Sequence, residues 1–410
     1  MDVAGHAYPV TNSTFEDTFG PMTDRPIGQL HPAEIAYPAV LPAKEATATP
    51  NAAAPRQPEG KAKGAGFLSY VHSLRGLSII AVIASHVAEL SGWDRGPSPL
   101  QRTLRTLFSN GTVPFVFVSG FLFQHLMPRF RYALYLRRRL ATVILPYLVV
   151  SVPTLLLQYV RGNGIYAGAE HASPIVVALR ACLVGAQMPL PLWYIPMIAL
   201  FFLAAPILQV LERRRWLVAT IIPSLLVAVF LHRSREHRLV FQSAAYFLPI
   251  YLAGMWASTR REAMLAFVDR YGRTLLAITV AAFVVEIVLQ GRTGPIYSRH
   301  PFSTEAGVLD LDLPIKLLLS FLVLALLRRY DTSVSWAFAG LADASFGLFF
   351  LHGYVLLAGA AALRRGSARP IHLGVGGFAL ALTGVVLVSM GGVRVVQRCL
   401  GRASRYAIGC

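Results

Sequence analysis

Residues 70–87 read Tyr-Val-His-Ser-Leu-Arg-Gly-Leu-Ser-Ile-Ile-Ala-Val-Ile-Ala-Ser-His-Val and are largely apolar. An apolar run of this length is typical of a helix that crosses the hydrocarbon core of a membrane. Arg75 and His86 interrupt it and stand eleven residues apart. At about 100° per residue this spacing brings both side chains to nearly one face of a helix, about 16 Å apart along its axis. Glu89 follows three residues after His86, on the same side.

Further runs of about 17 to 23 apolar residues, each long enough to span a membrane, follow along the chain. With the first run they make ten expected spans, at 73–91, 111–127, 141–160, 191–211, 216–232, 239–257, 273–290, 313–328, 344–363 and 372–391. The stretch 174–188 is shorter and is interrupted by Arg180, so an interfacial or re-entrant segment is predicted there. The expected fold is therefore all-α, a polytopic membrane helix bundle of about ten transmembrane helices.

The composition agrees with this fold class. The 410 residues are 55% hydrophobic and only 14% charged, with a net charge of +18. A soluble domain carries about 25% charged residues, and a nucleic-acid binder needs its basic groups on a solvated face. Here the charges lie between long apolar runs, so a soluble enzyme and a nucleic-acid partner are both disfavoured. The three cysteines give no disulfide framework.

Three regions are expected along the chain. Residues 1–65 contain nine prolines and no apolar run long enough to span a membrane, so we predict a disordered cytoplasmic tail that is not a signal peptide. Residues 70–392 form the membrane domain, and 393–410 form a short basic cytoplasmic tail. No loop exceeds about 30 residues, below the size of an independent domain, so any chemistry takes place within the bundle or at its rims.

The basic residues predict the orientation. With the N-terminus inside, the inner segments hold 21 Lys and Arg residues and the outer loops hold 13. Because cytoplasmic loops carry the excess of positive charge, both termini are expected in the cytoplasm.

Ionisable residues within spans are costly and are functional candidates by default. His86 has a side chain suited to proton transfer near neutral pH, although a hydrogen-bonded packing histidine with Arg75 as a rim anchor explains the pattern equally well. Glu286 lies in the seventh span at a depth similar to that of His86, so the two side chains are candidates for a contact. His352 lies in the ninth span.

Other motifs allow two interpretations. Ser119-Gly120 interrupts an aromatic span and, taken alone, indicates close helix packing. Arg137, Arg138 and Arg139 anchor the chain at the cytoplasmic face or clamp the phosphates of a nucleotide cofactor. Trp193 and Tyr194 are typical of an interfacial aromatic belt. Metal-ligand spacing, a Walker loop and a dinucleotide fingerprint are absent from the sequence, which argues against a transport ATPase, a redox enzyme or a metal site.

Taken together and in order, these motifs resemble the acyltransferase-3 family of bacterial integral-membrane acyltransferases, which O-acylate surface polysaccharides and related glycans. The matching stretches are Leu74-Arg-Gly-Leu through His86, Phe117-Val-Ser-Gly-Phe-Leu, the arginine block leading to Leu145-Pro-Tyr, Leu192-Trp-Tyr-Ile, Tyr246-Phe-Leu-Pro-Ile-Tyr-Leu-Ala-Gly, and Ser345-Phe-Gly-Leu-Phe-Phe-Leu-His. Ser73 stands where relatives commonly have Asp or Asn. Thr142 and Val143 stand where many have a further arginine.

The resemblance implies a site and a reaction. His86 would be the catalytic base or acyl carrier, Arg75 its essential partner, and Glu286 a group that orients the histidine. Arg137, Arg138 and Arg139 would bind the donor, acetyl-CoA or another short acyl-CoA, and no cofactor would be bound permanently. The remaining motif residues, Ser119, Trp193 and His352, would be the substrate-binding candidates.

The acceptor would be a hydroxyl of a surface or exported glycan, such as an exopolysaccharide, or of a lipid-linked saccharide. The implied location is the bacterial inner membrane. Two other classes of function remain open: a proton-coupled exporter or flippase of a lipid-linked glycan, and a non-catalytic subunit of a glycan assembly complex. The sequence leaves the oligomeric state open.

Overall fold

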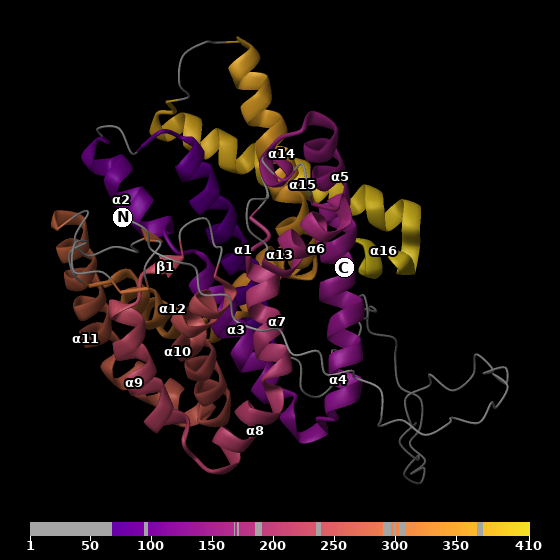
Figure 1. Ribbon diagram of the computed structural model, residues 1–410. Coiled ribbons are helices and arrows are strands. Elements are labelled where there is room, and N and C mark those ends of the chain that lie inside the picture. Colours follow the sequence, from indigo (N-terminus) through magenta and orange to yellow (C-terminus); the bar gives the residue numbers. More distant parts are fainter. Residues whose placement is uncertain are drawn as a thin grey trace, which may run out of the picture. The chain divides into compact units, whose positions relative to one another are not determined.

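The computed structural model describes residues 68–93, 97–167, 169, 172–184, 191–234, 239–289, 297–298, 301–302, 309–366 and 372–410. This part of the chain is almost entirely helical, so the predicted all-α class is confirmed (Figure 1). The strands β1 (Arg233–Ser234) and β2 (Tyr297–Ser298) are two residues long and pair in parallel. The predicted tail 1–65 lies outside the described residues.

The first half of the bundle contains nine α-helices. They are α1 (Ser69–Leu90), α2 (Pro99–Phe108), α3 (Thr112–His125), α4 (Tyr132–Arg139), α5 (Leu145–Arg161), α6 (Pro174–Val184), α7 (Tyr194–Leu203), α8 (Ala205–Arg213) and α9 (Leu217–Phe230). Short helical turns lie between some of them: η1 (Met127–Arg129), η2 (Leu140–Ile144) and η3 (Gly164–Tyr166). The turn η2 is π-helical and joins α4 to α5.

The second half contains the remaining helices. They are α10 (Val240–Thr259), α11 (Arg261–Val288), α12 (Asp312–Arg329), α13 (Asp331–Asp343), α14 (Ser345–Gly366), α15 (Val375–Leu400) and α16 (Ser404–Ala407), with the turn η5 (Gly401–Ala403) before α16.

Within the described ranges, six helical stretches are long and apolar enough to cross a membrane, so the chain is a membrane protein. They are Ser69–Leu90, Pro99–His125, Tyr132–Arg161, Arg261–Val288, Ser345–Leu363 and Val375–Ala407. The pair α7 and α8 would add a seventh span, bent by 56° at its break. The ten predicted spans are therefore not confirmed, although each falls on helix. Helix α9 has only 14 residues, and α12 carries charged side chains at both ends. The predicted interfacial stretch contains α6, whose 11 residues are too few to span.

Helices α3 and α10 cross closely because each has a glycine at the contact. A β-carbon on Gly120 would overlap the carbonyl oxygen of Tyr251, and one on Gly254 would overlap that of Phe117. The interpretation of Ser119-Gly120 as a close-packing element is confirmed.

Helix α1 is central in the bundle, since it packs against α3, α12, α13, α14 and α15. Its buried residues include Leu74, Ile79 and Ile83, whose exposed fractions are at most 2%. The helix that carries Arg75 and His86 is therefore held on most sides by other helices, which fixes the polar stripe in place.

Candidate functional site

A cavity with an empty volume of about 550 Å³ lies beside the N-terminal half of α1. Side chains of α1, α3, α4, η2, α7, α10 and α14 line it. Three of the residues singled out from the sequence, Arg75, Ser119 and Arg139, are among them. This volume includes space open to solvent, and two guanidinium groups give the cavity a positive charge.

Arg75 is held in the cavity wall by the last turn of α13. Its Nε donates a hydrogen bond to the carbonyl oxygen of Ala342 at 3.1 Å, and its Nη2 donates to the same oxygen. The next residue, Gly76, brings the two helices together, because a β-carbon there would lie 2.8 Å from the carbonyl oxygen of Phe338. The motif Arg75-Gly76 thus combines a close helix contact with a fixed guanidinium.

The arginine block separates into two parts. Arg139 lines the cavity, with its guanidinium carbon 5.2 Å from the ring centre of Tyr135 and 5.5 Å from that of Phe202. Arg137 and Arg138 are exposed on α4 and are not among the lining residues. Because successive residues of a helix differ in direction by about 100°, one arginine of three faces the cavity.

Ser119 and Tyr194 meet in the cavity wall. The Ser119 hydroxyl donates to the carbonyl oxygen of Phe115 at 2.9 Å, and its Oγ lies 3.2 Å from the hydroxyl of Tyr194. Since a serine has one hydroxyl proton, Tyr194 is the donor in the second bond. The sequence had pointed to Trp193 rather than to Tyr194, although both belong to the same motif.

Trp193 lies behind the cavity rather than in it. Its side chain is buried and stacks on Phe247, with ring centres 5.8 Å apart. The guanidinium carbon of Arg233 lies 5.0 Å from the centre of the Trp193 ring. Trp193 is therefore placed to hold Arg233.

His86 pairs with an acid on its own helix. Its Nδ1 lies 3.1 Å from Oε2 of Glu89, and the two side chains are 22% and 68% exposed. A carboxylate that accepts the Nδ1 proton leaves Nε2 of a neutral imidazole as a proton acceptor. Glu89 was not among the catalytic candidates, but its spacing of three residues from His86 was the signal.

His352 stacks on His86. The two ring centres are 5.6 Å apart, with 26° between the ring planes. The Nδ1 of His352 lies 3.0 Å from the carbonyl oxygen of Leu348, and its Nε2 is buried without a hydrogen-bond partner among the described residues. The last motif of the chain and the first thus meet at one place.

A series of rings joins the cavity to His86. Phe115 lines the cavity and stacks on Phe349, with ring centres 6.5 Å apart. Phe349 lies 6.1 Å from His352, which stacks on His86. A group passing from the cavity to His86 therefore meets aromatic side chains along the way.

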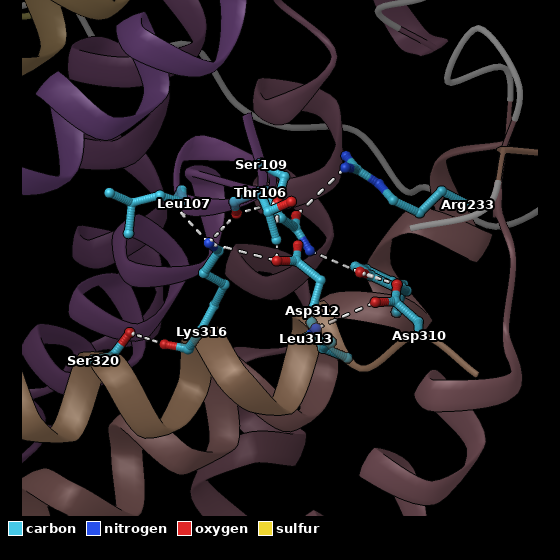
Figure 2. A network of polar contacts seen from close by, with 11 residues as sticks. Thr106, Leu107, Ser109, Arg233, Asp310, Asp312, Leu313, Lys316 and Ser320 are labelled. Atoms are coloured by element: carbon cyan, nitrogen blue, oxygen red, sulfur yellow. Dashed lines mark hydrogen bonds and ion pairs between the residues drawn. The ribbon is translucent and has the colours of Figure 1, made fainter. Parts of the chain in front are cut away.

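Glu286 belongs to a different set of charges. Helix α11 packs against α12, and the charges that act on Glu286 are those of Asp312, Lys316 and Asp310. Its Oε2 has no hydrogen-bond partner within the described ranges. The acid that contacts His86 is therefore Glu89 and not Glu286. Asp310, Asp312 and Lys316, the charged neighbours of Glu286, belong to the polar network drawn in Figure 2.

Metal binding finds no support in the part of the chain that the structure describes, where no group of three or more His, Cys, Asp or Glu side chains is arranged to hold an ion. The positive charges of the cavity suit an anionic ligand instead.

A membrane helix bundle that holds a basic cavity and two stacked histidines has the features of a membrane enzyme. The chain belongs to the acyltransferase-3 family: the acyltransferase domain that defines this family matches residues 68–390. The protein is therefore a membrane acyltransferase, and the resemblance found in the sequence is confirmed. No curated protein and no solved structure matches the chain.

Proposed function

We propose that this protein transfers an acetyl or other short acyl group from acyl-CoA to a hydroxyl of a surface or exported glycan. The observation that supports it best is that two chemically different groups lie toward opposite ends of α1. Arg75 lines a basic cavity near one end of the helix, and His86 forms a pair with Glu89 near the other.

The cavity would bind the donor. Coenzyme A carries phosphate groups, and guanidinium groups bind phosphate through paired, charge-assisted hydrogen bonds. The guanidinium of Arg139 already contacts two rings, so little side-chain freedom remains to be lost on binding. Arg137 and Arg138, exposed on the preceding turn, would attract the donor from solution without contacting it in the cavity.

His86 would supply the base. Its Nε2 would accept the proton of the acceptor hydroxyl while the hydroxyl oxygen attacks the thioester carbon, and the proton would then pass to the departing thiolate. Alternatively His86 would attack the thioester itself and carry the acyl group before passing it to the hydroxyl. Either route requires the acyl group to pass Phe115 and Phe349.

The proposed setting is a bacterial inner membrane with both chain termini in the cytoplasm. Arg75 and Arg139 would then face the cytoplasmic pool of acyl-CoA, and His86 would lie in the outer half of the bundle. The acceptor would be a glycan or lipid-linked saccharide at the outer side. Ser119, Trp193 and His352 would contribute to transfer only by shaping the path between the cavity and His86.

The test is acyl incorporation into a glycan, measured with isotope-labelled acyl-CoA in membranes that contain the protein. We expect His86→Ala to reduce transfer by at least about a hundredfold, the lower end of the range for a lost general acid or base. A control, Arg214→Ala, changes an exposed residue beyond α8 and should leave transfer unchanged. Full transfer by a folded His86→Ala variant would refute the role of His86. Glycan movement without consumption of acyl-CoA would favour the exporter instead.

The acceptor can be identified in a separate experiment. Mass spectrometry of surface glycans from cells with and without the protein should show one mass difference, equal to that of the acyl group. Unchanged glycans would show that surface glycans are not the acceptor. Consumption of acyl-CoA would then be tested with other hydroxyl compounds.

A further inference from the structure

Buried polar side chains gather a second time at the turn between α2 and α3, away from the cavity (Figure 2). We call this group the turn network. Its members are at most 7% exposed, and they are Asn110, Arg233, Tyr246, Asp310, Asp312 and Lys316. Burying such groups is costly unless they are paired, so their arrangement calls for a role.

Lys316 and Asp312 hold the end of α2. The Lys316 ammonium donates to the carbonyl oxygens of Thr106 and Leu107 at 2.7 and 2.6 Å. Asp312 lies 3.5 Å from Lys316 and accepts a hydrogen bond from the Ser109 hydroxyl at 2.9 Å. These carbonyls have no partner within a helix that ends here, so α12 fixes where α2 stops.

Asn110 makes the turn itself. Its φ of 52° is in the left-handed region, which asparagine adopts more readily than most residues. Its Nδ2 donates to the Tyr246 hydroxyl at 2.7 Å, and its Oδ1 accepts from Nη1 of Arg233 at 3.4 Å. Tyr246 in turn donates to Asp310 at 2.5 Å. The turn conformation is thus held by a side chain of helix α10 and one of strand β1, and Asp310 in the loop before α12 supports the first of them.

The turn presses directly on α1. A β-carbon on Gly111 would lie 2.5 Å from the carbonyl oxygen of Ala81 and 2.9 Å from the backbone nitrogen of Val82. His86 is four residues beyond Val82, about one helical turn. The turn network therefore reaches the backbone of α1 immediately before the His86 and Glu89 pair.

Arg233, which bonds to Asn110 of the turn, is itself held by aromatic rings. Its guanidinium carbon lies 5.0 to 5.5 Å from the ring centres of Trp193, Tyr246 and Phe247. Cation contacts with rings restrict a guanidinium to one orientation, so the aromatic residues determine where that charge is placed.

We propose that Asn110 and Arg233 are positioning residues for His86. They hold the α2–α3 turn against α1 one helical turn before His86, so that α1 presents the His86 and Glu89 pair in one orientation. This inference rests on the proposed function for its catalytic consequence, but the orientation of His86 can be measured without any substrate.

The experiment compares Asn110→Ala, Arg233→Gln and Arg233→Lys with the unaltered full-length protein in detergent. Two quantities are measured: kcat and KM for acyl transfer, and the rate at which diethyl pyrocarbonate modifies His86, determined by mass spectrometry relative to His125 at the other end of α3. Arg161→Gln, at the exposed end of α5, is the matched control. Size-exclusion chromatography establishes that each variant is folded.

We expect Asn110→Ala and Arg233→Gln to lower kcat at least tenfold, with KM for acyl-CoA within twofold of the original. The His86 to His125 modification ratio should change at least threefold, and Arg233→Lys should recover part of both effects. An unchanged ratio would overturn the inference, whether or not kcat falls, and so would an unchanged kcat. If the unaltered protein transfers no acyl group, the proposed function fails, and the modification ratio alone decides the positioning role.

Discussion

The cavity and the turn network both bury positive charge, but they balance it in different ways. In the turn network Lys316 lies 3.5 Å from Asp312 and donates to two backbone carbonyls. In the cavity Arg75 bonds to the carbonyl oxygen of Ala342, and Arg139 lies against aromatic rings. Among the described residues, no ion pair includes Arg75 or Arg139. A buried cation that is paired with a carboxylate serves the stability of the fold. A cation without such a partner is suited to bind an anionic ligand.

Removing a charge from the turn network should have the largest effect, and it should act on stability. Lys316→Met leaves Asp312 buried without its cation, and breaking a buried pair costs about 3–5 kcal/mol. We expect a marked loss of thermal stability in detergent, measured as a lower Tm. The double variant Lys316→Met with Asp312→Leu should recover most of the loss, since replacing a whole buried pair by apolar groups is nearly neutral. A Lys316→Met protein as stable as the original would contradict the structural role.

Removing a charge from the cavity should instead act on activity. Arg75→Ala should lower acyl transfer by about a hundredfold, equivalent to about 2.7 kcal/mol, while the protein stays folded in the membrane. Arg75→Lys should not restore it, because a lysine lacks the planar guanidinium that donates twice to Ala342. The measurement is labelled acyl incorporation alongside Tm. If Arg75→Ala lowered Tm as much as Lys316→Met does, the cavity and the turn network would not differ in the way proposed.

Arg139 and Arg138 should differ in their effect on donor binding, because only Arg139 lines the cavity. Arg139→Ala should raise KM for acyl-CoA about tenfold, or about 1.4 kcal/mol, and Arg138→Ala should raise it by less than about threefold. Steady-state kinetics at low and high salt would measure both, since exposed charges are screened more strongly than half-buried ones. Equal effects for the two variants would mean that the cavity geometry does not decide donor binding.

The last prediction concerns the pH dependence of stability. Burial and the neighbouring Asp312 raise the pKa of Asp310, in the loop before α12, from 3.8 to about 7. Between these values the folded protein keeps a proton that the unfolded chain has released, so the free energy of unfolding should fall as pH rises from about 4 to about 7. Tm measured at pH 5 and at pH 7.5 should show the fall, and Asp310→Asn should reduce it. A Tm that rises over this range in the original protein would contradict the expectation.

The sequence predicted the helical class, the polar stripe of α1 and the close packing at Gly120, because each depends on spacing along one helix. It did not predict which arginine faces the cavity, since that depends on the rotation of α4 relative to α7. It placed Glu286 near His86 by depth alone, and depth does not specify which helices are neighbours. The number of spans is not confirmed, because length and charge along each helix decide it: α9 has only 14 residues, and α12 carries charged side chains at both ends.

The π-helical turn η2 has a consequence for the tolerance of this protein to insertion and deletion. A π turn holds one residue more than the α-helical turn it replaces, and α5 on its far side is anchored against α6 and α16. Deleting one residue from 140–144 would turn α4 by about 100° and bring Arg138 to the position of Arg139. A one-residue deletion in this segment would therefore still present a guanidinium to the cavity, whereas a one-residue insertion would present Leu140.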